Sequence, residues 1–258
     1  MKIAVCFYGL VGSKSHKDGK GTPLPPELAH AYYQDNIFAH QSCDIFIHSW
    51  SIEHKQNIIE LYKPKSFLIE PQKYFTIAPK LCPKLSWKDR LFSLVNKNIR
   101  VNSLAKYNSI HRAYSRWYSN KQTLKLMENY EDQTGIKYDC VMVTRLDIAF
   151  FNKIIFSDYN LDIFWASHWN DPPLPDNNFQ YNYENHYQGT GFLDFWFFSN
   201  SNNMKQFGML FDKIEDYHPS PHRASYEHVT TFTDRIGYTF FRWIDHEMIR
   251  RKFFSSQE

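Results

Sequence analysis

The residues best suited to chemistry stand at the end of one apolar run. Residues 138–147 read Tyr-Asp-Cys-Val-Met-Val-Thr-Arg-Leu-Asp, so a buried strand would deliver Arg145 and Asp147 at its carboxyl end. Charged groups in such a place need partners, because a buried charge without one is costly. Arg145 could hold a phosphate through two parallel hydrogen bonds, and Asp147 could bind a divalent cation through oxygen. The two side chains could instead pair with each other or with a neighbouring helix.

Two more carboxylates are candidates for a general base. Asp194 lies among aromatic residues, where burial would favour its protonated form unless a hydrogen bond offsets that effect. Glu227 stands beside His228 near the start of a predicted helix, 225–236. Either carboxylate could instead cap a helix or form a buried ion pair.

The first elements that must position these residues alternate between strands and helices. This order predicts a parallel sheet with helices on its faces, an α/β fold. Ligands of such sheets bind at the carboxyl ends of the strands, which is where Arg145 and Asp147 are placed. The pattern predicts strands at 2–8, 44–50 and 66–69, with helices at 32–40 and 53–61.

The first predicted strand ends at Gly9, where a glycine would let the backbone approach a nucleotide closely. Tyr8 and Leu10 flank it and are candidates for the same site. Arg112 lies on the most regular helical pattern of the chain, which runs from about residue 103 to Gly135, and it could reach a diphosphate. Arg100, Lys106 and Arg116 compete for that role. For each of these residues an ordinary turn or surface role is the alternative.

The second half of the chain predicts further elements around an irregular stretch. Residues 169–190 contain three prolines and several asparagines, which is typical of a mobile active-site loop. The patterns predict strands at 163–167, 192–198 and 237–244, and helices at 87–95, 203–216 and 225–236.

Length and charge limit the classes of function. The 258 residues suffice for one sizeable α/β domain, and the net charge of +3 is too small to indicate a nucleic-acid partner. The charge is nevertheless uneven: residues 80–125 hold eleven Lys or Arg and one acid, whereas residues 128–194 hold eleven acids and three Lys or Arg. This division suits a site for phosphates and a divalent cation, although solvated surfaces would give the same pattern.

The cysteines and the hydropathy pattern predict a cytoplasmic protein. None of the four cysteines forms a C-x-x-C motif, and Cys6 and Cys140 lie inside apolar runs, which favours a reducing compartment. No stretch approaches the roughly 18 apolar residues of a membrane span. The basic residues of 80–125 and 250–252 could touch the inner face of an anionic membrane.

Several short motifs together resemble capsule- or surface-glycan glycosyltransferases of bacteria and large viruses. The likeness extends from residue 2 to about residue 240 and implies a GT-A fold, a nucleoside-diphosphate sugar donor and a glycan or lipid-linked saccharide acceptor. The motifs are Tyr8-Gly9, the Asp-Ile-Phe-Ile-His-Ser-Trp segment from Asp44, Tyr107-Asn108-Ser109-Ile110, Tyr138-Asp139 before Val-Thr-Arg-Leu-Asp, and Asp194-Phe195-Trp196-Phe197-Phe198 followed by Met204.

This resemblance also implies a Mn²⁺ or Mg²⁺ ion, but the motif that would hold it is incomplete. Many GT-A enzymes have Asp-x-Asp where this chain has Arg145-Leu146-Asp147, so only Asp147 keeps the metal-binding role. Some GT-A enzymes use a late histidine as a further ligand, and His246 is the candidate for it. Arg145 could itself neutralise the diphosphate in place of a metal.

We therefore expect a single glycosyltransferase-like domain over 1–258, with a nucleotide-sugar half at 1–150 and an acceptor half at 151–258. Two other functions remain open. A sugar nucleotidyltransferase should carry a longer glycine-rich basic loop than residues 9–14, and a glycan-binding module would use the aromatic residues without turnover. A P-loop kinase is disfavoured because the sequence lacks G-x-x-x-x-G-K-[ST].

Overall fold

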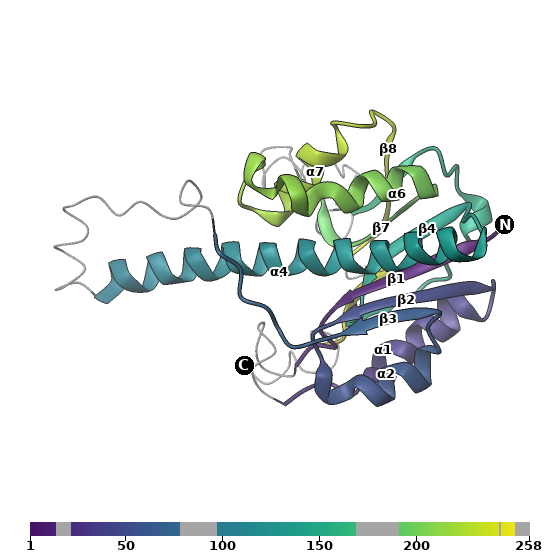
Figure 1. Cartoon of the computed structure of the whole chain (residues 1–258), viewed down its shortest axis with the longest axis horizontal. Coiled ribbons are helices and arrows are strands. Elements are labelled where there is room, and N and C mark those ends of the chain that lie inside the picture. The colour runs from purple at the N-terminus through teal and green to yellow at the C-terminus, as the bar shows by residue number, and fades with distance from the viewer. Residues whose placement is uncertain (14–21, 78–96, 169–190, 243, 251–258) are drawn as a thin grey trace.

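The first strand, β1 (Ile3–Gly9), lies in the middle of the main sheet of the computed structural model (Figure 1). Its side chains alternate between two apolar cores, one on each face of the sheet. Val5 and Phe7 belong to one core, and Cys6 and Tyr8 belong to the other. A strand buried on both faces has little use for polar residues, which explains its near-continuous apolar run.

The structure describes residues 1–13, 22–77, 97–168, 191–242 and 244–250, with side chains of the long helix from residue 109 onward. Seven strands form the main sheet in the order β3-β2-β1-β4-β7-β6-β8. The bounds of the other six are β2 (Cys43–Ser49), β3 (Ser66–Ile69), β4 (Cys140–Arg145), β6 (Phe164–His168), β7 (Leu193–Ser199) and β8 (Ile236–Phe241).

Helices cover both faces of this sheet (Figure 1). On one face lie α1 (Pro26–Tyr33), which continues as a π-helical turn to Phe38, and α2 (Lys55–Tyr62). On the other face lie α4 (Lys97–Thr134) and α6 (Ser201–Gly208), which is followed by a 3₁₀ segment (Met209–Asp216). The helix α7 (Pro221–Val229) packs near the start of β7. The predicted α/β fold with a mostly parallel sheet and flanking helices is thus confirmed.

The helix α4 is 38 residues long, or about 57 Å, and runs along one face of the sheet and well beyond it (Figure 1). Its buried side chains, among them Trp117 and Met127, pack against the sheet. Gly135 follows the helix with a φ of +71°, a left-handed conformation that suits glycine and ends the helix as the sequence predicts.

One strand, β7, runs antiparallel to both of its neighbours, β4 and β6. The start of β7 therefore lies at the same edge of the sheet as the carboxyl end of β4. Asp194, the second residue of β7, is brought to the edge where Arg145 ends β4. A separate two-stranded sheet, β5 (Ile148–Phe150) with β9 (His246–Met248), extends from this edge.

Some predicted boundaries are wrong for physical reasons. The helix predicted at 32–40 already begins at Pro26, because proline is tolerated in the first turn of a helix. The helix predicted at 225–236 ends at Val229, and Ile236 begins β8 instead. There the Trp165 ring covers Gly237 so closely that a Cβ would lie 2.6 Å from it.

Several predicted segments cannot be compared with the structure, because their residues are not among those described. The helix predicted at 87–95, the loop predicted at 169–190 and most of the basic tail at 250–252 lie outside the described residues.

Strands from 1–150 and from 151–258 share one sheet. Within the described part of the chain, none of the helices has the length and apolarity to cross a bilayer.

Candidate functional site at the carboxyl edge of the sheet

Arg145 and Asp147 form an ion pair at the carboxyl end of β4. Arg145 donates from Nε to Asp147 Oδ1 and from Nη2 to Asp147 Oδ2, both at 2.7 Å. Burial opposes the charge on Arg145, but Asp147 outweighs that effect and raises the pKa of the guanidinium. Tyr33 fixes the end of the strand because its hydroxyl donates to the Arg145 carbonyl at 2.7 Å. The sequence left open whether Arg145 and Asp147 pair with each other, and in this structure they do.

A second ion pair joins Asp194 to Arg116 of α4. His222, at the start of α7, places its Nδ1 3.5 Å from Asp194 Oδ1. The Tyr8 hydroxyl donates to the Asp194 carbonyl at 2.9 Å. Burial, with the nearby positive charge of Arg145, lowers the pKa of Arg116 to about 10. Asp194 is thus a buried carboxylate with a cationic partner.

A third ion pair lies beside Phe195. Arg242 donates from Nε to Glu247 Oε2 at 2.9 Å. Burial raises the pKa of Glu247, although a backbone hydrogen bond and Arg242 oppose the shift. The Phe195 ring centre lies 5.5 Å from the Arg145 guanidinium and 5.7 Å from that of Arg242, so this ring connects the first and third pairs.

In the first two pairs the arginine is more exposed than its carboxylate. The side-chain exposures are 20% and 7% for Arg145 and Asp147, and 22% and 1% for Arg116 and Asp194. Each carboxylate therefore lies deeper in the protein than the guanidinium group that it binds. A guanidinium has five N–H donors and Asp147 occupies two of those on Arg145, so the described residues leave three for an anion.

The loop after β1 packs against this cluster. Gly9 and Gly12 have φ values of +94° and +90°, which few other residues adopt. A Cβ on Gly12 would lie 3.3 Å from the Cβ of Asp147, so the loop approaches the first ion pair closely. Ser119 of α4 accepts a hydrogen bond from the Gly9 amide at 2.9 Å and thereby fixes the start of the loop.

The predicted metal ligands Asp147 and His246 are not brought together. His246 pairs with Phe150, three residues beyond Asp147, so about 10 Å of strand separates their backbones. His246 places Nε2 2.7 Å from Ser167 Oγ, and both oxygens of Asp147 accept from Arg145. Among the described residues, no three His, Cys, Asp or Glu side chains gather where they could hold a metal ion.

The remaining predicted residues have varied positions. Leu10 is half-buried in the loop after β1, and Arg112 is exposed one helical turn before Arg116. Glu227 accepts from the His218 amide at 2.8 Å and lies 3.5 Å from Arg223, so it holds the start of α7 in place. These contacts give Glu227 the structural role that the sequence left open.

Sequence reasoning missed His222, Arg242 and Glu247, and it gave Arg116 only as a competitor of Arg112. The two arginines lie one helical turn apart on nearly the same face of α4, so only the tertiary packing of the helix decides which of them reaches Asp194. Arg242 and Glu247 are five residues apart, a spacing that carries no recognisable pattern. The start of α7 approaches Asp194 through tertiary contacts, which the local sequence around His222 does not reveal.

The chain matches no protein-family model and no curated protein. Among solved structures, it is similar to the nucleoside-diphosphate-sugar pyrophosphorylase from Vibrio cholerae RC9, with 9% identity and a TM-score of 0.44. The similarity covers 96% of this chain and 95% of that chain. A likeness this low carries no argument about function.

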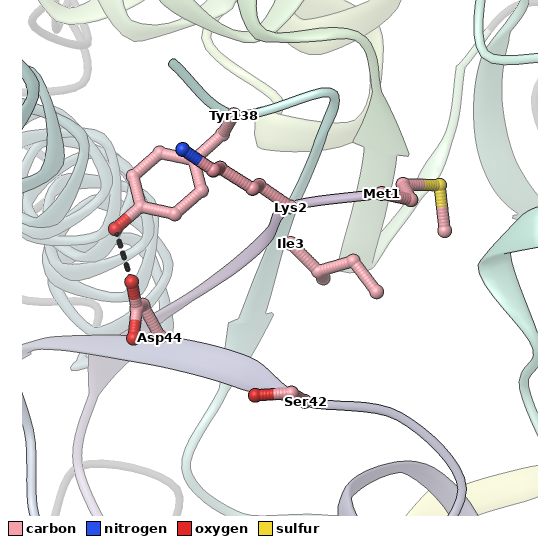
Figure 2. Close-up of a pocket in the computed structure, with 6 residues that line it drawn as sticks. All are labelled: Met1, Lys2, Ile3, Ser42, Asp44 and Tyr138. Atoms are coloured by element: carbon pink, nitrogen blue, oxygen red, sulfur yellow. Dashed lines mark hydrogen bonds between the residues drawn. The ribbon is translucent and has the colours of Figure 1, made fainter. Parts of the chain in front are cut away.

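A small pocket lies at the opposite edge of the sheet (Figure 2). Asp44 at the start of β2 accepts a hydrogen bond from the Tyr138 hydroxyl at 2.7 Å, and Lys65 lies 3.5 Å from the same carboxylate. The carboxylate of this pocket is therefore already paired, and the six residues that line the pocket include no arginine. It is lined by Met1, Lys2, Ile3, Ser42, Asp44 and Tyr138.

Acid is expected to destabilise the fold through three buried histidines. Burial lowers the pKa of His48 to about 4 and the pKa of His222 and of His246 to about 3, with Arg116 adding to the shift at His222 and Arg242 at His246. The unfolded chain binds these protons near pH 6.5. The stability from the neutral rings is therefore complete above about pH 6.5 and is lost as the pH falls toward 3 to 4.

We expect each of these histidines to lower the free energy of unfolding by about 1.4 kcal/mol per pH unit below pH 6. Urea denaturation between pH 7.5 and 4.5 measures this slope. His246→Gln should reduce this slope by about the contribution of one histidine. His40→Gln, at an exposed position, should leave the slope unchanged. Identical slopes for the wild type and His246→Gln would contradict the assignment.

Proposed function

We propose that this chain transfers a sugar from a nucleoside-diphosphate sugar to a glycan or lipid-linked acceptor. The observation that carries the proposal is the row of arginine–carboxylate pairs at the carboxyl edge of the sheet, beside a loop with two left-handed glycines. Buried ion pairs contribute little to stability compared with apolar residues of similar volume. Binding of an anion would explain why charged residues occupy these positions.

The charges of the site suit a diphosphate. Arg145 and Arg116 are each about one-fifth exposed, while Asp147 and Asp194 lie behind them. Because Asp147 uses both of its oxygens, it orients the Arg145 guanidinium and leaves donors for phosphate oxygens. When the bond from the sugar to the diphosphate breaks, the electron pair stays on the phosphate oxygen, and these guanidinium groups stabilise the added charge. In this scheme Asp147 is a positioning residue.

Transfer also needs a base for the acceptor hydroxyl, and we propose Asp194 for it. The carboxylate is only 1% exposed and is paired with Arg116. A diphosphate that binds Arg116 competes with Asp194 for the same guanidinium. Asp194 then keeps His222 as its neighbour, 3.5 Å away, and can accept a proton from the hydroxyl.

Incubation with a panel of nucleotide sugars tests this function. We expect release of a nucleoside diphosphate from one donor in the panel, faster when a saccharide acceptor is present. Parallel samples with Mn²⁺ and with EDTA report whether a metal is needed. No turnover with any donor, from a protein that melts cooperatively, would contradict the proposal.

A second candidate function is sugar nucleotidyl transfer. The loop with Gly9 and Gly12 favours it, because a left-handed glycine loop after the first strand could cradle the phosphates of a nucleoside triphosphate. Release of pyrophosphate from a nucleoside triphosphate and a sugar phosphate would identify this activity. Release of a nucleoside diphosphate from a nucleotide sugar would identify the first.

A further inference from the structure

A second polar cluster lies along the same sheet edge, away from the three ion pairs. The strands β1, β2 and β3 are neighbours and parallel, so their carboxyl ends place Gly9, Trp50 and Glu70 in a row. Tyr118 of α4 stacks on Trp50 with ring centres 5.6 Å apart and planes 21° apart. Lys73 follows Glu70 by three residues and lies 2.9 Å from its carboxylate.

Hydrogen bonds hold Glu70 in a fixed position relative to Gly9. Glu70 Oε1 lies 3.2 Å from His48 Nε2, and His48 Nδ1 lies 2.6 Å from Ser119 Oγ. An ionised carboxylate can only accept, so Nε2 carries the proton of the neutral ring and Nδ1 accepts from Ser119. Ser119 in turn accepts from the Gly9 amide at 2.9 Å. The chain of bonds therefore joins the loop after β1 to the carboxylate after β3.

The donors around Glu70 leave one of its oxygens to a ligand. His48, Lys73 and Tyr118 all reach Oε1, at 3.2, 2.9 and 3.3 Å. In the described part of the chain, each of these three donors contacts Oε1 rather than Oε2. Hydrogen bonds from Lys73 and His48 outweigh the effect of burial and lower the pKa of Glu70, which keeps it ionised and accepting at neutral pH. Lys73 is 45% exposed in its side chain, so its ammonium can also reach a ligand.

We propose that Glu70 and Lys73 select guanine as the base of the nucleotide. The inference rests on the proposed function, because it takes a nucleoside diphosphate as the ligand of this edge. Guanine presents an O6 acceptor beside the N1–H and N2–H₂ donors. Lys73 would donate to O6, and Glu70 would accept from N2–H₂, beside N1–H.

Other bases fit this cation and carboxylate less well. Uracil has one N–H between two carbonyl oxygens, and its second oxygen would face the carboxylate. The edges of adenine and cytosine place a bare ring nitrogen beside their amino group, where a carboxylate would repel it. Trp50 is buried and stacks on Tyr118, so this aromatic pair supports the cluster and does not discriminate between bases.

The distance along the sheet edge fits one nucleotide. The strands β3 and β4 are three positions apart in the sheet, which is about 14 Å. A nucleoside diphosphate with its base at Glu70 and its phosphates at Arg145 would cross Gly9, the residue whose backbone allows a close approach. One extended ligand thus connects both polar clusters.

Calorimetric titration of the full chain with nucleoside diphosphates tests the proposal. We expect GDP to bind at least about tenfold more tightly than UDP, and ADP and CDP to bind more weakly still. Inosine diphosphate keeps O6 and N1–H but lacks the N2 amine, so it should bind about tenfold more weakly than GDP. Equal or tighter binding of UDP would overturn the guanine assignment and leave the proposed function intact. No binding of any nucleoside diphosphate would overturn both.

Glu70→Gln distinguishes base selection from a structural role. We expect the variant to lose about tenfold in GDP affinity while UDP changes less, so that the preference for GDP falls. A purely structural role through His48 and Gly9 would weaken both nucleotides equally, and that result would overturn the proposal. Glu60→Gln, at an exposed carboxylate of α2, is the matched control and should bind as the wild type does. The comparison of GDP with inosine diphosphate needs no variant and decides the matter if Glu70→Gln does not fold.

Discussion

Asp147→Asn is expected to lower turnover of the nucleotide sugar by about a hundredfold or more while the fold persists. An amide can accept through one oxygen only, and its NH₂ group would face an N–H of Arg145. The guanidinium would lose the two parallel hydrogen bonds of 2.7 Å that orient it toward the diphosphate. Asparagine has nearly the same shape as aspartate, so the contact with Gly12 is kept. Steady-state kcat and KM with the donor measure the effect.

Asp212→Asn is a suitable control for this variant. Asp212 also pairs with a cation, Lys121, but its side chain is 49% exposed and lies on the 3₁₀ segment after α6. Its replacement should change neither turnover nor melting temperature measurably. Normal turnover by a well-folded Asp147→Asn would refute the role of the first ion pair.

The sheet could be predicted from the sequence wherever local patterns determine structure. Val5 and Cys6 belong to an apolar run that only a central strand buries on both faces, and the strand at Ser66–Ile69 lies where it was expected. The direction of β7 could not be predicted, because an apolar run reads the same in both directions. Yet that direction brings Asp194 to the site.

The partners within the site depended on tertiary structure. Arg112 and Arg116 differ by one turn on the same helix, and only the packing of α4 decides that Arg116 meets Asp194. His246 was matched to a metal site by its place late in the chain. The register of β9 against β5 instead places it opposite Phe150. Long-range register and the placement of a helix along the sheet are collective properties of the core, so residue spacing alone could not give them.

Arg116→Met is expected to have the largest effect on stability, a loss of about 3 to 5 kcal/mol in the free energy of unfolding. Methionine keeps the apolar stem of the side chain, but it leaves Asp194, which is 1% exposed, without its guanidinium partner. The reverse change, Asp194→Asn, leaves a guanidinium that is 22% exposed and can still be hydrated, so it should cost less. Urea denaturation at pH 7.5 measures both losses.

The double variant Arg116→Met/Asp194→Asn separates the charge from the packing. If the buried charge causes the loss, removing it should restore most of the stability, and the two effects should be far from additive. Equal losses in Arg116→Met and the double variant would show instead that Arg116 stabilises the fold through packing of its side chain. Such a result would also weaken the mechanism proposed for transfer, because that mechanism requires Arg116 to hold Asp194 until a diphosphate competes for it. The stability of the pair and the readiness of the base thus depend on the same guanidinium.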